Sequence, residues 1–118
     1  MEIVNKGILL ADDVKFNDDI FSKTRGLMFS RPLKKGQALV LVADHESVME
    51  TTIHMMFVFF SIDVVWLDQN KVVVDMRKNV WSFTPLITPR KPAKYVVELP
   101  KNTLHHIKIG DQFQFIER

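Results

Sequence analysis

The segment from residue 51 to residue 67 constrains the fold more than any other part of this sequence. It is rich in β-branched and aromatic residues, which are favoured in strands. Over residues 62–67 both alternating sets of side chains are mostly apolar, and successive side chains of a strand point to opposite faces of a sheet. We therefore predict that residues 57–67 form an interior strand that is covered on both sides.

Further short runs of β-forming residues flank this strand. Asn5-Lys6-Gly7 separates two apolar runs and predicts an opening hairpin, because Asn and Gly tolerate the positive φ of tight turns. Residues 68–71 predict a second hairpin turn, and three prolines make 81–92 an extended loop. The predicted strands besides 57–67 are 3–4, 8–10 with an extension toward 16, 37–42, 72–77, 95–99 and 113–115.

One short helix is predicted near residues 18–28. Asn17 is a favourable N-cap, apolar residues recur at helical spacing from 20 to 28, and Gly26 suits a helix end. Residues 103–107 predict a single helical turn. Together these elements predict a mainly β (α+β) fold, a small barrel-like antiparallel or mixed sheet of six or seven short strands.

Size and composition are those of one small globular domain over residues 1–118. The absence of cysteine excludes disulfides, thiolate metal sites and cysteine nucleophiles. Residues 1–6 lack the features of a signal peptide, and the longest apolar run, 55–60, is far too short to span a bilayer. We therefore expect a soluble, cytoplasmic protein without a membrane partner. A net charge of +2 neither requires nor excludes a polyanionic partner.

Four segments in order resemble a known family. Residues 24–33 read TRGLMFSRPL, 53–68 read IHMMFVFFSIDVVWLD, 93–100 read AKYVVELP and 109–111 read IGD. They are similar to the domain-of-unknown-function 192 family, with a central segment of the archaeal type, and the resemblance covers roughly residues 10–116. It implies a small mixed-β fold with little helix and supplies no agreed activity. Many bacterial relatives carry a WMKNT segment where this chain has Thr52-Ile53-His54-Met55-Met56, so a role of that Trp or Asn does not transfer.

Asp63 is the one carboxylate inside the predicted interior strand. A buried, unpaired carboxylate costs several kcal/mol, so we expect a partner among Arg25, Arg31 and Arg77, because an arginine can bind a carboxylate through two hydrogen bonds. One interpretation is a structural ion pair, which we favour. The other is a carboxylate at the floor of a ligand pocket, with Arg25, His54 and Tyr95 as further contacts.

No metal site, cofactor or catalytic residue is predicted. His54 lies among methionines, but no pair of candidate ligands has a recognised metal spacing, and adjacent His105 and His106 diverge on a strand or a helix. Nucleophile-elbow, phosphate-loop and zinc-protease motifs are absent from the sequence. An enzyme that uses Asp63 or Glu98 with His54 as acid–base groups is the least supported alternative.

A basic stretch with interleaved aromatics runs from 76 to 97 without an acidic residue between Asp75 and Glu98. Such a pattern is typical of single-stranded nucleic-acid grooves, although a solvated basic loop beside the core is the favoured interpretation. The candidate anion or nucleic-acid contacts are Arg77, Lys78, Trp81, Arg90, Lys91 and Lys94. We predict a non-catalytic ligand-binding or accessory module with an unidentified small ligand or protein partner. Nucleic-acid or anion binding through 77–95 is the alternative.

Overall fold

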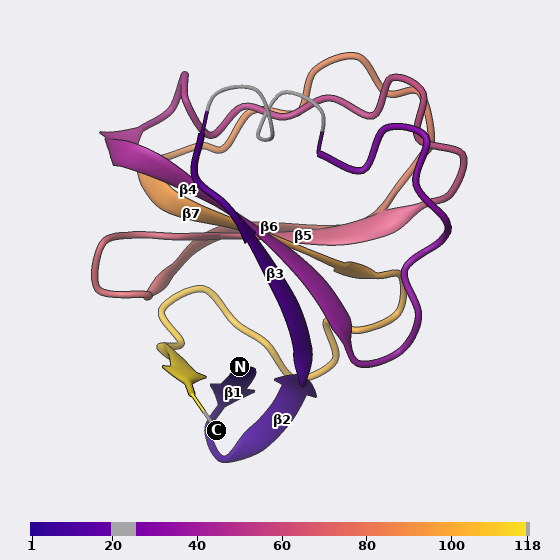
Figure 1. The fold of residues 1–118 in the computed structure, drawn as a ribbon. Coiled ribbons are helices and arrows are strands. Elements are labelled where there is room, and N and C mark those ends of the chain that lie inside the picture. Colours follow the sequence, from indigo (N-terminus) through magenta and orange to yellow (C-terminus); the bar gives the residue numbers. More distant parts are fainter. Residues whose placement is uncertain (20–25, 118) are drawn as a thin grey trace.

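Two β-sheets make up the computed structural model, which describes residues 1–19 and 26–117 (Figure 1). The small sheet has the order β2–β1–β8 and the large sheet the order β3–β4–β7–β5–β6. Only β3 and β4 are parallel; the other paired strands are antiparallel. The strands are β1 (Glu2–Asn5), β2 (Ile8–Ala11), β3 (Asp13–Asn17), β4 (Gln37–Ser47), β5 (Ile62–Leu67), β6 (Val73–Val80), β7 (Ala93–Pro100) and β8 (Phe113–Ile116).

Strand β5 is an interior strand with two apolar faces, but it spans residues 62–67 and not the predicted 57–67, because residues 57–61 are irregular. All of its residues are buried, and it lies between β6 and β7 in the large sheet. Val64 and Trp66 belong to a core on one face of the sheet, and Val65 and Leu67 belong to a second core on the other. The alternation of a strand thus places one set of side chains in each core.

Different parts of the chain cover the two faces of the large sheet. The small sheet packs on one face, where Ile3 and Phe113 join the second core (Figure 1). Irregular segments cover the other face through Leu27, Met55 and Ile87. The indole N–H of Trp66 donates to the Thr51 carbonyl at 2.8 Å, which ties one of these segments to β5.

The sheets do not close into the predicted barrel. The extension of the opening hairpin toward residue 16 is interrupted at Asp12, and β3 then pairs with β4 instead of continuing β2. The Gly36 carbonyl accepts hydrogen bonds from the backbone N–H groups of Asp12 and Asp13, which fixes this crossing. Strands β1, β2 and β8 pair only with one another, and β3 to β7 pair only with one another, so no strand of the described residues belongs to both sheets.

The helical predictions are not supported. Most of 18–28 lies outside the described residues, and 26–29 form a turn. The helical turn over 103–107 is wrong, because these residues form bends and His106 has a φ of 64°, a left-handed conformation that ends a helix. The described part of the chain contains no helix.

Asp63 is buried, with 1% of its surface exposed, but the predicted arginine pair is wrong for the described residues. Its carboxylate accepts backbone N–H groups from Asn79 at 2.8 Å, Thr103 at 2.9 Å and Leu104 at 3.1 Å. Arg77 instead donates to the Thr88 carbonyl at 3.1 Å, and Arg25 lies outside the described residues. Backbone donors therefore satisfy the carboxylate that we expected a guanidinium to neutralise.

Replacing Asp63 with alanine is expected to lower the free energy of unfolding by about 3 kcal/mol, because three buried N–H groups lose a charged acceptor. Urea denaturation of the wild type and the variant measures this difference. Asp44→Ala is the matched control, because Asp44 is an exposed residue. A loss no larger than that of the control would show that the carboxylate does not hold these segments together.

Candidate functional site

A groove of about 970 Å³ opens beside the loop that Asp63 anchors. Its walls come from the β1–β2 hairpin, the segment before β4, the segment before β5 and the loop after β7. The apolar part of the wall consists of Ile8, Leu9, Leu10, Leu33, Phe59 and Phe60. A concave, mostly apolar surface of this size is typical of ligand sites.

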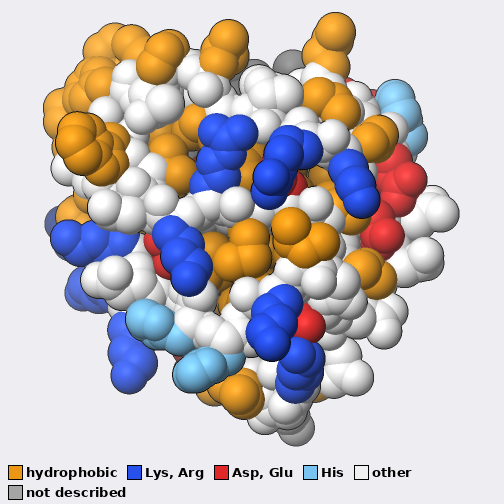
Figure 2. Space-filling view, turned by 180° about the vertical axis from the view of Figure 1, so that it is seen from behind, with side chains coloured by type: hydrophobic (Ala, Val, Ile, Leu, Met, Phe, Trp, Pro, Cys, Tyr) orange, Lys and Arg blue, Asp and Glu red, His pale blue; other side chains and the backbone are white. Residues whose placement is uncertain are grey.

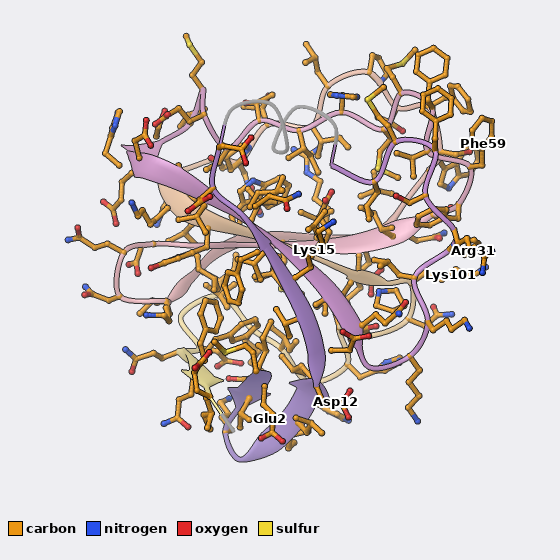
Figure 3. The ribbon with its side chains drawn as sticks, in the orientation of Figure 1. Glu2, Asp12, Lys15, Arg31, Phe59 and Lys101 are labelled. Atoms are coloured by element: carbon orange, nitrogen blue, oxygen red, sulfur yellow. The ribbon has the colours of Figure 1, made fainter. Side chains whose placement is uncertain are left out.

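The polar part of the groove is basic. Lys35, Lys101, His105 and His106 line it, and no Asp or Glu does. Figure 3 shows Lys101 and Phe59 on the same side of the molecule, with Arg31 between them. A second hollow of about 240 Å³ shares both histidines and adds Lys6 and Lys108. The groove therefore combines an apolar wall with groups that attract anions.

Backbone hydrogen bonds position both basic walls. Asp63 accepts the N–H groups of Thr103 and Leu104, and the Thr103 hydroxyl donates to the Pro100 carbonyl, so the loop that carries Lys101 and the histidines is held to the core. On the opposite wall, the Lys34 N–H donates to Gln37 Oε1 at 2.8 Å, and the Gln37 N–H donates back to the Lys34 carbonyl at 2.9 Å. The groove is thus formed by loops with fixed ends.

The predicted ligand contacts do not gather in this groove. Asp63 lies behind the wall, and Arg25 lies outside the described residues. His54 is half-buried, and its Nδ1 accepts the Met56 N–H at 3.2 Å. Tyr95 contacts the Phe115 ring and the Lys71 ammonium, 5.5 Å from its ring centre. Neither lines the groove, and their role in ligand binding stays a prediction.

The basic stretch predicted to bind anions is divided between structural and exposed residues. Arg90 binds the fully buried Asp75 through Nε at 3.2 Å and Nη2 at 2.8 Å, and its backbone N–H donates to the other oxygen. Although burial opposes ionisation, these hydrogen bonds hold the pKa of Asp75 below its usual value. Lys94 donates to the Asp44 carbonyl at 3.0 Å. Lys78, Trp81 and Lys91 are exposed.

Figure 2 shows Lys and Arg side chains spread across one face of the molecule and hydrophobic side chains gathered at one upper corner. Phe59, labelled at the upper right of Figure 3, lies toward that corner when the view is turned. The surface therefore brings a broad basic face next to an exposed apolar cluster.

Four basic residues of the groove are not among the residues that the sequence predicts for a site: Lys35, Lys101, His105 and His106. We treated the two histidines as diverging neighbours, yet both line the groove because residues 103–107 form neither a strand nor a helix. The available signal was the charge pattern, since residues 26–36, 53–61 and 100–107 contain no Asp or Glu.

Glu98 is a second buried carboxylate, on β7 between Leu39 of β4 and Val64 of β5. It is 3% exposed, and among the described residues its Oε1 has no hydrogen-bond partner. Burial raises its pKa to about 8, because an unpaired charge is costly in an apolar core. Glu98 does not line the groove.

Residues 1–19 and 26–117 contain no group of three or more His, Asp or Glu arranged to hold a metal ion. The same residues contain no helix that is long and apolar enough to cross a membrane.

The fold and the groove define a small two-sheet β protein, and comparison with known proteins places it in a family. The chain matches the domain-of-unknown-function 192 family (DUF192), described as "Uncharacterized ACR", over residues 2–115. It is 34% identical to a UPF0127 protein of Thermococcus sibiricus, covering 93% of this chain and 70% of the relative. It is 32% identical to a UPF0127 protein of Pyrococcus furiosus, covering 95% and 94%. The chain therefore belongs to the domain-of-unknown-function 192 family, which confirms the resemblance seen in the sequence.

Two crystal structures share the fold. A protein of unknown function from Novosphingobium aromaticivorans superposes with a TM-score of 0.79 at 16% identity, covering 86% of this chain and 74% of that one. A Sinorhizobium meliloti protein, proposed to be a transcription regulator, also gives 0.79 at 18% identity, covering 86% and 79%. At such identities the likeness concerns the fold alone.

The raised pKa of Glu98 predicts how stability depends on pH. Between about pH 4.5 and 8 the folded state keeps the Glu98 proton that the unfolded state releases. This group therefore makes stability fall as pH rises through that range, by up to about 1.4 kcal/mol per pH unit. Glu98→Gln removes this contribution, so its unfolding free energy declines less than that of the wild type. Urea denaturation at several pH values between 4.5 and 8 measures the unfolding free energy of each protein. Glu117→Gln, which changes an exposed carboxylate, is the control. If the unfolding free energies of the wild type and Glu98→Gln fall equally with pH, the raised pKa of Glu98 is contradicted.

Proposed function

We propose that this protein is a non-catalytic binding module whose groove takes an anionic ligand with an apolar part. The observation that carries the proposal is the composition of the groove wall: lysines and histidines, apolar side chains and no carboxylate. Lys35 and Lys101 would neutralise the charged group. Phe59, Phe60 and Leu33 would cover the apolar part.

The state of the nearby carboxylate supports binding over catalysis. Both oxygens of Asp63 accept backbone N–H groups, so the carboxylate holds the 100–106 loop in place. A general base needs a lone pair directed at the substrate. The role of Asp63 is therefore to shape the groove.

Lys101→Glu is expected to weaken binding of an alkyl phosphate of medium chain length by about tenfold, because it replaces attraction of the phosphate by repulsion at a partly solvated site. Isothermal titration calorimetry measures the affinity, and the alcohol of the same chain length is the neutral probe. Lys91→Glu, another exposed lysine, does not line the groove and is the matched control. Equal affinity for phosphate and alcohol, or equal losses in both variants, would exclude an anion site in the groove.

A second candidate function is single-stranded nucleic-acid binding through 77–95. The observation that favours it is Trp81, which is 72% exposed and lies in the same stretch as the exposed Lys78 and Lys91. An exposed indole can stack on a base while the lysines contact the phosphates. Arg77, Arg90 and Lys94 would add positive charge from their bonded positions.

Under this second candidate, the double variant Lys78→Glu/Lys91→Glu is expected to reduce affinity for a single-stranded oligonucleotide by about tenfold or more and to lower the salt dependence of binding. Arg90 is left unchanged, because its loss would leave buried Asp75 unpaired. Fluorescence anisotropy at several salt concentrations measures both quantities. Lys35→Glu, which changes a groove residue, is the control. If the double variant binds the oligonucleotide as tightly as the wild type, nucleic-acid binding through 77–95 is rejected.

A further inference from the structure

Four phenylalanines form an exposed aromatic platform next to the groove. Phe29 stacks on Phe57 with ring centres 5.1 Å apart, and Phe83 meets Phe57 at 6.0 Å and Phe59 at 5.2 Å. Phe29 and Phe59 are 64% and 63% exposed, and Phe57 and Phe83 are exposed by 43% and 40%. Exposed apolar clusters of this kind mark interaction surfaces.

The backbone under the platform favours glycine. Phe29, Phe57 and Phe83 have φ values of 57°, 58° and 63°, in the left-handed region that glycine adopts without steric cost and bulky residues rarely adopt. Backbone hydrogen bonds fix these loops, since the Phe29 N–H donates to the Phe57 carbonyl and the Phe83 N–H to the Met55 carbonyl. Phe29 and Phe59 are mostly in solvent and Phe57 and Phe83 are partly so, which leaves much of this aromatic surface unburied.

The surroundings of the platform carry one sign of charge. Residues 26–36, 53–61 and 80–88, which supply the four rings, contain no Asp or Glu although the chain has 14. Arg31 follows Phe29 by two residues, and Lys101 shares the groove with Phe59. Figure 3 shows Arg31, Lys101 and Phe59 along one side of the molecule. This surface therefore complements an occupant that is anionic and accepts aromatic rings.

A second copy of the chain does not meet these requirements. A two-fold contact brings the same patch of both copies together, and it would place Arg31 and Lys101 of one copy near those of the other. The rings also belong to loops, and Figure 3 shows Phe59 at the outer edge of the molecule. Projecting rings suit the headgroup region of a bilayer, which needs no matching shape and whose anionic lipids attract the surrounding cations.

We propose that the aromatic platform docks the protein on an anionic lipid surface, with the four phenylalanines inserted among the headgroups and Arg31 and Lys101 bound to lipid phosphates. The protein then lies on the membrane without crossing it, which departs from the sequence-based expectation of no membrane partner. Phe59 and Lys101 belong to both surfaces, but Phe29, Phe57 and Phe83 do not line the groove, so the docking surface extends beyond the site of the proposed ligand.

Co-sedimentation with vesicles tests the proposal. We expect binding to phosphatidylcholine vesicles that contain phosphatidylglycerol, at least about tenfold weaker binding to phosphatidylcholine alone, and loss of binding at high salt. Phe29→Gly should weaken binding about tenfold or more while the melting temperature stays level or rises, because glycine relieves the φ of 57°. Phe59→Ser, where no positive φ is involved, should weaken binding similarly.

Ile109→Ser is the matched control, because Ile109 is 53% exposed but belongs to none of the platform segments. The inference is overturned if the wild type does not bind anionic vesicles at low salt. It is also overturned if Phe29→Gly and Phe59→Ser bind as the wild type does, or if only the control loses binding. Alkyl phosphate binding by Phe29→Gly separates the two proposals. If this variant binds alkyl phosphate as the wild type does but no longer binds vesicles, docking belongs to the platform. If the wild type binds vesicles but not alkyl phosphate, only the proposed groove ligand is rejected.

Discussion

The structure depends on one buried carboxylate that binds backbone. Asp63 is the second residue of β5 and joins this strand to the β6 end at Asn79 and to the loop at Thr103 and Leu104. A charged acceptor with three N–H donors needs no counter-charge, because the donors supply the stabilisation that water would give. The loop that it holds is the one that carries the groove lysine and histidines. A buried polar group thus fixes the loop that forms one wall of the groove.

The two faces of the large sheet are covered in different ways, and this difference decides where binding surfaces arise. A regular sheet covers one face. Loops cover the other face, with Met55, Val58 and Ile87 directed into the core. Loop residues between these anchors point outward, as Phe57 and Phe59 do. Loops can present side chains that a strand would have to bury, so the aromatic platform is a consequence of how this core is closed.

Much of the fold was predictable because strand patterns are local. The two apolar faces of 62–67, the turn at 68–71 and the hairpin at Asn5-Lys6-Gly7 each specify a structure without long-range information. The prediction was wrong where a tertiary contact decided the outcome. The Gly36 carbonyl accepts the N–H groups of Asp12 and Asp13 at the point where the chain passes from one sheet to the other. At Asp63, backbone N–H donors take the place of the expected arginine. Residues 57–61 resemble strand in composition, yet they form an irregular segment with exposed rings.

The candidate surfaces were less predictable than the fold for a related physical reason. Binding surfaces combine residues from distant segments, and here the groove joins residues near 8, 35, 59 and 101. What the structure adds is a conflict between the backbone conformation and the side chain it carries. Phenylalanine at a left-handed position opposes the backbone preference, and such conflicts concentrate where function overrides folding. Three such phenylalanines meet in one exposed cluster whose segments also lack acidic residues. Left-handed backbone conformation, exposure and a lack of acidic residues therefore coincide on the same surface.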